Sequence, residues 1–290
     1  MQLAVLSDVH GNLPALKAVI QTLQTKDLSG ILVAGDLTGC PWPNEAIQLL
    51  IEHNCIMIRG NGENGLLKLI DHTAPHAWEV NKQYALARWT VRTLDSSLIS
   101  LIRSLPDQRV IHMAGTDPIR IVHGSPFDSS DSVYPHRQPE SFVRAMEAVS
   151  EPVTIFGHTH SPWQISLDGR LAFNPGAVSA PLDGKVGAQY AILTWTDSCW
   201  QAQLHHISYD IKDVRHGFEQ SGLLKEGGAL ARTFLLSIET GIDVTEDFID
   251  LAYELMHQTT QEYTAFIPDE IWDQADQQFN WQNYKKQSLH

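Results

Sequence analysis

The chain opens with the segment Leu3-Ala-Val-Leu-Ser-Asp-Val-His-Gly-Asn12, in which an apolar run is followed at once by polar residues. A short, uninterrupted apolar run is typical of a strand that is buried on both faces. Asn12 is a suitable cap for a helix whose apolar residues recur at helical spacing up to Leu23. Further apolar runs at residues 31–34 and 55–58, separated by a second helical pattern, extend this to a β-α-β-α-β order. The order predicts a parallel sheet with right-handed crossovers.

The remainder of the chain predicts a helical insertion, a return to strands and a helical end. Residues 64–107 break the alternation, with helices expected at about 81–93 and 96–105. Strands resume at 110–113, 119–122 and 153–156, and Asp168-Gly169 and Asp197-Ser198 are hairpin signals between later strands. Beyond Val214 the chain is polar and helical, with apolar stripes at 230–238 and 248–255, and we expect a loosely ordered tail from Pro268.

Composition excludes several classes of protein. Of the 290 residues, 43% are hydrophobic and 19% charged, which is the composition of a globular chain rather than a disordered one. Three cysteines without C-x-x-C spacing support neither a disulfide framework nor a zinc knuckle. A net charge of −14 argues against general nucleic-acid binding. No apolar run is long enough for a membrane span or a signal peptide, so we expect a cytoplasmic protein.

Residues of the kinds that bind metals follow each strand of the α/β part. The clusters are Asp8-Val9-His10, Gly35-Asp36, Gly60-Asn61-Gly62-Glu63, His123-Gly124 and Gly157-His158-Thr159-His160. In open α/β sheets, sites form beyond the carboxyl ends of the strands, so these clusters should converge on one edge. Each cluster alone is a weak signal, but their joint placement predicts a shared metal site.

The order of these clusters resembles that of the calcineurin-like metallophosphoesterases, whose pattern is D-x-H, G-D, G-N-H-D/E, H and G-H-x-H. Asn174-Pro-Gly-Ala177 is similar to the N-P-G-S of the small bacterial and archaeal phosphodiesterase branch. The resemblance covers about residues 1–210. It implies an α/β fold, a four-layer α/β/β/α sandwich of two mixed β-sheets. We therefore expect a metallophosphoesterase domain at 1–213, with 64–107 as a lid-like insertion, and a C-terminal helical extension at 214–290.

The resemblance also implies a dinuclear metal centre. One ion would take Asp8, His10 and His160, the other Asn61, His123 and His158, and Asp36 would bridge the two. This mixture of imidazole and oxygen ligands suits divalent transition metals, with manganese favoured over Fe, Zn, Co and Ni. Two such ions bring about +4 and the two carboxylates return about −2, which lets an acidic protein bind phosphate. The expected enzyme is a phosphodiesterase that attacks phosphorus with a metal-bridging hydroxide.

Gly62 departs from the family pattern, because a histidine placed to protonate the leaving oxygen usually follows the ligand asparagine. Glycine cannot donate a proton from a side chain, and general acids contribute about 10²–10⁴-fold to the rate. The departure favours phosphodiesters, phosphoanhydrides and aryl esters over alkyl monoesters. The general acid is therefore unknown, and side chains that might replace it are Glu63, His72, His76 and His112.

Substrate contacts are expected from Arg59, beside the ligand turn, and from Trp78 and Trp89 in the insertion. With Tyr84, these aromatic residues either pack in the core or form a platform for a nucleobase. One alternative function is therefore hydrolysis of dinucleoside polyphosphates or nucleotides, and an alternative of another class is a noncatalytic metal-binding scaffold. The expected partner is a small phosphate ester, and the apolar stripes near the end of the chain suggest a homo-oligomer.

Overall fold

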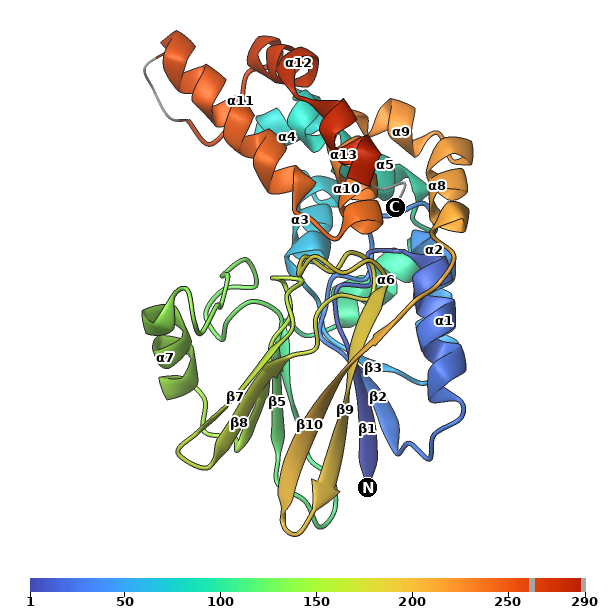
Figure 1. Ribbon diagram of the computed structural model, residues 1–290, viewed down its shortest axis with the longest axis vertical. Helices are drawn as coiled ribbons and strands as arrows, with labels where there is room; N and C mark the ends of the chain where they lie inside the picture. Colours follow the sequence, from blue (N-terminus) through green and yellow to red (C-terminus); the bar gives the residue numbers. More distant parts are fainter. Residues whose placement is uncertain (261–263, 288–290) are drawn as a thin grey trace.

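Two five-stranded mixed sheets form the centre of the computed structural model, which describes residues 1–260 and 264–287 (Figure 1). The first sheet has the order β10-β9-β1-β2-β3, and the second has the order β4-β5-β6-β8-β7. The strands of the first sheet are Gln2–Leu6 (β1), Gly30–Val33 (β2), Ile56–Met57 (β3), Ala188–Thr196 (β9) and Cys199–Ile207 (β10). Those of the second are Gln108–Ile111 (β4), Ile119–Val122 (β5), Val153–Ile155 (β6), Trp163–Leu167 (β7) and Arg170–Asn174 (β8).

Both sheets combine a parallel centre with antiparallel edges. Strands β1, β2 and β3 are parallel, as are β5, β6 and β8, and the remaining strands pair antiparallel. The two predicted hairpins are confirmed by the pairs Leu167↔Arg170 and Thr196↔Cys199.

The alternation of side chains along β1 explains why its apolar run is uninterrupted. Leu3 and Val5 point into a core between the two sheets, where they meet residues of the second sheet such as Phe173. Ala4 and Leu6 point the other way, into a core shared with the helices on the outer face. Because both faces of the strand are covered, each of its residues from Leu3 to Leu6 is buried.

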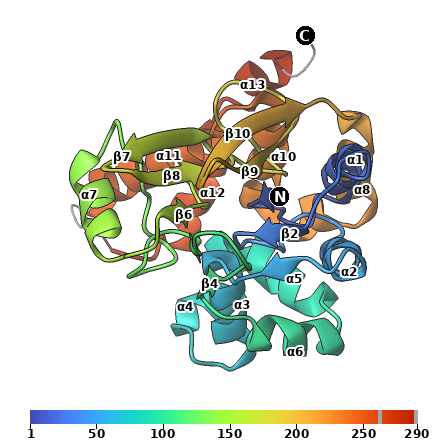
Figure 2. The same cartoon turned by 90° about the horizontal axis from the view of Figure 1, so that it is seen from below.

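Helices cover the outer face of each sheet and complete the predicted four-layer α/β/β/α sandwich (Figure 2). Helices α1 (Leu13–Leu23), α2 (Pro43–Glu52) and α6 (Ser96–Ser104) pack on the first sheet, and α7 (Pro139–Glu147) packs on the second. Asn12 caps α1 as expected, since its side chain accepts a hydrogen bond from the Ala15 amide.

The insertion is more helical than the sequence indicates. The two expected helices are present as α5 (Ala85–Thr93) and α6, and they are preceded by α3 (Asn61–Ile70), α4 (His76–Val80) and a 3₁₀ turn at Lys82–Tyr84. The sequence does not predict α3, because it contains glycines at positions 62 and 65 and glycine disfavours helices. A local capping contact compensates in part, because the Glu63 side chain accepts a hydrogen bond from the Gly60 amide at the start of the helix.

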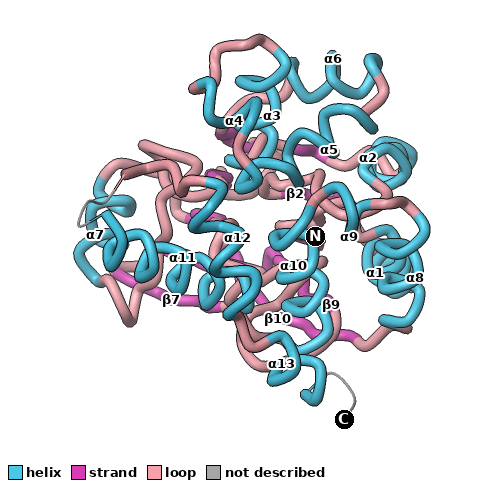
Figure 3. The backbone as a smooth tube through the Cα atoms, turned by 90° about the horizontal axis from the view of Figure 1, so that it is seen from above, coloured by secondary structure: helices cyan, strands magenta, loops and turns pink. Residues whose placement is uncertain are grey.

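The chain ends in a series of helices at the end of the sheets where β1 and β2 finish (Figures 1 and 3). They are α8 (Ile211–Gln220), α9 (Leu223–Glu226), α10 (Gly228–Thr240), α11 (Val244–Thr260), α12 (Asp269–Gln278) and α13 (Trp281–Gln287). We refer to them as the C-terminal helices. In the described part of the chain, no helix combines the length and the apolar character that crossing a membrane requires.

The expectation of a loosely ordered tail from Pro268 was wrong. Trp272 and Phe279 are buried against Phe248 of α11, and these ring contacts hold α12 in place. The apolar stripes at 230–238 and 248–255 likewise pack largely within the chain. They therefore provide no argument for a homo-oligomer, which stays a prediction.

We predict that Phe248→Ala lowers the free energy of unfolding by about 3–5 kcal/mol, the usual cost of emptying a fully buried aromatic site. Phe127→Ala is the matched control, because Phe127 is 54% exposed and Phe248 is fully buried. The control should change the free energy of unfolding by less than about 1 kcal/mol. Chemical denaturation followed by circular dichroism measures both variants. Equal, small effects would show that α11 to α13 are not packed as described.

Candidate metal centre

The seven predicted ligands converge at the carboxyl ends of the parallel strands. Asp8 and His10 follow β1, Asp36 follows β2, and the remaining ligands follow β3, β5 and β6. Two groups have ligand atoms within 4.8 Å of one another: Asp8, His10 and His160 in one, and Asp36, His123 and His158 in the other. Asn61 joins the second group, with its Oδ1 3.0 Å from His123 Nε2.

Backbone carbonyls fix the orientation of three of the histidine rings. The Nδ1 atoms of His10, His123 and His160 lie 3.1, 2.6 and 2.8 Å from the carbonyl oxygens of Thr38, Ala34 and Ala180. A carbonyl only accepts hydrogen bonds, so each Nδ1 carries the donated proton. In the neutral ring, Nε2 then presents its lone pair to the centre, which is the arrangement that metal-binding histidines need.

Some of the converging atoms lie against one another without a hydrogen-bond donor between them, and these contacts test whether a cation fits. The Nε2 atoms of His10 and His160 lie 3.0 Å apart. Asp8 Oδ1 is 3.4 Å from His160 Nε2, and it is buried without a hydrogen-bond partner among the described residues. Buried acceptors that face one another are unfavourable unless a cation lies between them. The residues present therefore fit the metal ions that the ligand pattern implies.

Charges in the centre also favour cations. Burial opposes ionisation of Asp36, but the neighbouring His123 and His10 outweigh it and hold the pKa of Asp36 below its ordinary value. Burial opposes protonation of His123, yet Asp36 and Asp8 raise its pKa to about 10. The two carboxylates thus attract positive charge, and metal ions can supply it in place of protons.

Five of the seven ligands adopt a backbone conformation that non-glycine residues rarely use. Asp8, His10, Asp36, His158 and His160 all have φ between 45° and 66°. Such residues cost free energy and persist where the surrounding structure imposes them, most often at functional sites. The sharp turns let two ligands that are separated by one residue point at the same centre.

Gly60 and Gly62 bring the start of α3 against Asp36. A Cβ atom on Gly60 would lie 2.1 Å from Asp36 Oδ1, so only glycine fits at position 60. The amide of Gly62 donates a hydrogen bond of 2.9 Å to the same oxygen. Asp36 therefore lies at the positive end of a helix, which stabilises its ionised form.

None of the four candidate replacements for the missing acid lies at the metal centre. Glu63 is fully buried and accepts hydrogen bonds from the amides of Leu37, Thr38 and Gly60 and from the Thr38 hydroxyl. Burial, together with repulsion from Asp36, raises the pKa of Glu63 to about 6. Glu63 thus joins the Asp36 loop to α3 and does not face a ligand.

The other three candidates are exposed side chains away from the ligands. His72 and His76 are 82% and 80% exposed and pair with Glu79. His112 follows β4, which runs antiparallel to β5, so it lies at the opposite end of the sheet from His123. In these positions none of them reaches the leaving oxygen of a metal-bound ester.

The segment Asn174-Pro-Gly-Ala177 supports the loop that carries two of the ligands. The Asn174 amide donates to the Gly157 carbonyl at 2.6 Å and to the Thr159 hydroxyl at 3.1 Å. Its Oδ1 accepts from the Gly176 amide. Asn174 is therefore a positioning residue for His158 and His160, a role that the sequence pattern does not reveal.

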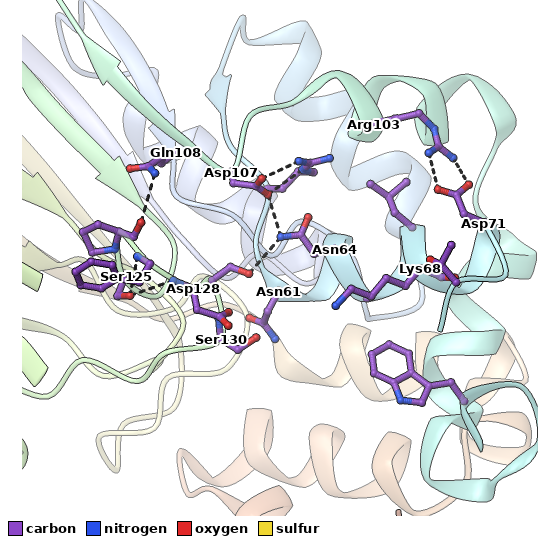
Figure 4. A pocket seen from close by; sticks show the side chains of 18 residues that line it. Asn61, Asn64, Lys68, Asp71, Arg103, Asp107, Gln108, Ser125, Asp128 and Ser130 are labelled. Carbon is purple, nitrogen blue, oxygen red and sulfur yellow. Dashed lines mark hydrogen bonds and ion pairs between the residues drawn. The ribbon is translucent and has the colours of Figure 1, made fainter. Parts of the chain in front are cut away.

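The predicted substrate contacts divide into two that line a cavity and one that does not. Arg59 and Trp78 line a polar cavity of about 760 Å³ that also contains the ligand Asn61 (Figure 4). Lys68 projects from α3 into the same cavity. Arg59 is paired with Asp107. The expectation that Trp89 contacts substrate is corrected, because this side chain is 4% exposed. It packs with Phe218 and other residues of the C-terminal helices, which leaves no face for a ligand.

One residue beside the centre was missed. Phe234 of α10 lies edge-on to the His10 ring, with ring centroids 5.2 Å apart. In the sequence it is one apolar position in the stripe at 230–238, and nothing in that spacing indicates that it reaches the ligands.

We predict that Asp36→Asn weakens binding of Mn²⁺ at least tenfold while the fold persists, because the variant removes a charge that both ligand groups share. Asp168→Asn is the matched control, since Asp168 is an exposed turn residue with φ of 51°. Calorimetric titration of metal-free protein measures both variants, and circular dichroism verifies the fold. Unchanged affinity in Asp36→Asn would remove Asp36 from the site.

Comparisons with known proteins agree with this geometry. The model of the calcineurin-like phosphoesterase superfamily domain matches residues 1–198. An uncharacterised protein of Methanocaldococcus jannaschii is 28% identical over 229 residues, which cover 72% of this chain and 88% of that protein. The crystal structure of a metallophosphoesterase from Sphaerobacter thermophilus is similar with a TM-score of 0.66 and 26% identity, over 83% of this chain and all of that one.

A hypothetical protein from Pyrococcus horikoshii shares the fold, with a TM-score of 0.66 and 21% identity over 78% of this chain and 98% of that one. The family model covers more than half of the chain and includes all seven predicted ligands. The chain therefore belongs to the calcineurin-like phosphoesterase superfamily, a family of phosphoester hydrolases, and it carries two candidate metal-ligand groups.

Proposed function

We propose that the protein is a dinuclear metal-dependent phosphodiesterase. The observation that carries this proposal is the pair of adjacent ligand groups, each with one carboxylate and two histidines. His10 Nε2 lies 3.5 Å from Asp36 Oδ2, and His123 Nε2 lies 3.4 Å from the same oxygen. Asp36 thus stands between the two groups, as a bridging ligand should. The retention of every ligand argues against a noncatalytic scaffold.

The residues of the chain have distinct tasks in this proposal. When bound, the ions would act as Lewis acids that polarise the phosphoryl group and lower the pKa of water. The oriented histidines and the ionised Asp8 and Asp36 would hold the ions, and because only two of these ligands are charged, the occupied centre would keep a net positive charge. Asp8, Asp36 and His123 are buried, so the floor of the site is closed to water. Lys68 and Arg59 bring positive charge to the polar cavity beside Asn61.

The absence of a side chain at position 62 favours diesters and other substrates with good leaving groups. Glu63, His72, His76 and His112 do not reach the centre, so in this proposal the leaving oxygen departs with little protonation. Phenolates and phosphates tolerate this better than alkoxides do.

Helix α3 provides room for two ester groups. Its residues Asn61, Asn64 and Lys68 face the polar cavity, whereas Gly62 and Leu66 face a second cavity of about 340 Å³. This division follows helical spacing. A diester at the metal centre would therefore have a separate space on each side of α3, whereas a monoester needs one.

Hydrolysis of nucleotides or dinucleoside polyphosphates is the second candidate. Trp78 stacks on Tyr84 with ring centroids 4.8 Å apart, and Trp78 also lines the polar cavity with Arg59 and Lys68. A base near Trp78 and phosphates near the cations would suit this arrangement.

We predict that the Mn²⁺-loaded protein hydrolyses bis(4-nitrophenyl) phosphate with a kcat/KM at least tenfold above that for 4-nitrophenyl phosphate.

Gly62 lies within α3 and outside the left-handed region, so a side chain there is not strained by the backbone. Gly62→His should therefore restore a donor and raise kcat for an alkyl monoester relative to the aryl diester, by up to about 10²–10⁴-fold.

Gly62→Gln is the control for this experiment, because glutamine adds bulk without an acidic proton. A Cβ atom at position 62 would lie 3.0 Å from Asp36 Oδ1, so the metal content of both variants must be measured beside the rates. If Gly62→His and Gly62→Gln shift the substrate preference equally, the missing proton donor does not explain the preference. A wild-type protein that prefers the monoester would contradict the diesterase proposal.

A further inference from the structure

The second cavity beside α3 is walled by the C-terminal helices as well as by the insertion. Its apolar lining residues come from α3, α5, α10 and α11 and are Leu66, Leu86, Ala87, Leu230, Phe234 and Ile249. The metal ligand His10 and the residue Gly62 also line it. The cavity therefore opens directly onto the metal centre, and we call it the apolar cavity.

Several polar groups in this wall are already paired. The hydroxyl of Thr90 donates to the Leu86 carbonyl, and the hydroxyl of Thr245 donates to the Thr233 hydroxyl. The hydroxyl of Thr38 is bound to Glu63, and the side-chain oxygen of Gln83 accepts from the Ile267 amide. A nucleobase would regain only some of the hydrogen bonds to water that it loses on entering such a cavity, from groups such as the Tyr84 hydroxyl and the Gln83 amide nitrogen.

The two cavities differ in whether charged side chains line them. The polar cavity is lined by three cationic and three anionic side chains, namely Arg59, Lys68, Arg103, Asp71, Asp107 and Asp128. Among the described residues that line the apolar cavity, none is aspartate, glutamate, lysine or arginine. The apolar cavity thus selects an uncharged, apolar group beside a centre that selects phosphate.

Position 62 contributes to the shape of the apolar cavity. A Cβ atom on Gly62 would lie 3.0 Å from Asp36 Oδ1, so a side chain at this position would begin beside the metal centre. Gly62 and Phe234 line the same cavity, and the absence of a side chain at position 62 leaves that part of the wall without one.

We infer that the apolar cavity binds an alkyl or aryl group of the phosphate ester, and that the C-terminal helices thereby determine substrate specificity. The inference rests on the proposed function, because it assigns the substrate class of that same site. A natural substrate would carry one apolar group, placed against Leu230, Phe234 and Ile249. Its other group, which is polar or charged, would lie in the cavity of Arg59 and Lys68.

The test measures binding rather than turnover. Mn²⁺-loaded protein is titrated calorimetrically with inorganic phosphate and with methyl-, butyl-, hexyl- and octylphosphonate. Each methylene that enters an apolar site contributes about 0.8 kcal/mol, so we expect the Kd to fall about three- to fourfold per carbon until the cavity is filled. Adenosine and uridine 5′-monophosphates should bind more weakly than hexylphosphonate.

Two variants with matched controls locate the effect. Ala87→Phe fills the cavity and should abolish the dependence on chain length, whereas Ala85→Phe, on the same helix but outside the cavity lining, should preserve it. Leu230→Ala should reduce the gain per carbon. Leu224→Ala should not, because Leu224 lines a separate cavity with Arg215 and Trp281. Circular dichroism and metal content confirm that each variant is folded and loaded.

The outcomes separate this inference from the proposed function. If phosphate binds but chain length has no effect, or if Ala87→Phe and Ala85→Phe behave alike, the apolar assignment is overturned and the metal centre stands. Tighter binding of the nucleotides than of hexylphosphonate would overturn it in favour of a nucleobase. If inorganic phosphate itself does not bind to the metal-loaded protein, the proposed function fails as well.

Discussion

The structure depends on an electrostatic conflict at the ends of its parallel strands. Asp8 and Asp36 are buried carboxylates, and the Nε2 atoms of His10, His123 and His160 face them, since the Nδ1 atoms of these rings are bound to backbone carbonyls. Buried carboxylates of this kind are unfavourable unless protons on the histidines or metal ions lie between them. Much of the local structure fixes the positions of these carboxylates and histidines. The ligands occupy left-handed turns, Gly60 admits Asp36 to within contact of the α3 backbone, and Glu63 and Asn174 anchor the loops from outside. A centre held this rigidly is organised for ions before they arrive, which reduces the cost of ordering it upon binding.

The same centre explains why an acidic chain can act on phosphate. The net charge of −14 is distributed over the whole molecule, whereas the field at the ligands is set by two carboxylates and the bound ions. Helix α3 then separates two unlike environments within a few residues. One face carries Asn64 and Lys68 toward a polar cavity, and the other carries Gly62 and Leu66 toward an apolar one. In the proposed function, the ions provide the reaction common to the family, and the two cavities provide the specificity of this chain.

The sequence predicted the features that local chemistry determines. The run at Leu3–Leu6 predicts a buried strand, and Asp168-Gly169 and Asp197-Ser198 predict the hairpins. The clusters of candidate ligands were predicted to converge from their places after strands, whereas the individual ligands were assigned from the family resemblance. It did not predict features that depend on distant packing. Trp89 was proposed to contact substrate, but Phe218 and its neighbours cover it. His112 follows a strand, as ligands do, but its strand runs antiparallel to β5. The tail after Pro268 has a polar composition, and its order comes from a few rings around Phe248. Phe234 contacts His10 because α10 packs over the ends of the strands. The sequence around Phe234 does not predict this packing.

Anomalous diffraction from crystals grown with Mn²⁺ tests the central claim most directly. The account predicts two peaks about 3–4 Å apart, the spacing typical of two-metal hydrolases. One peak should lie among Asp8, His10 and His160, the other among Asn61, His123 and His158, with Asp36 bonded to both. A single peak, or a second ion held without Asp36, would contradict the dinuclear centre on which the proposed function rests.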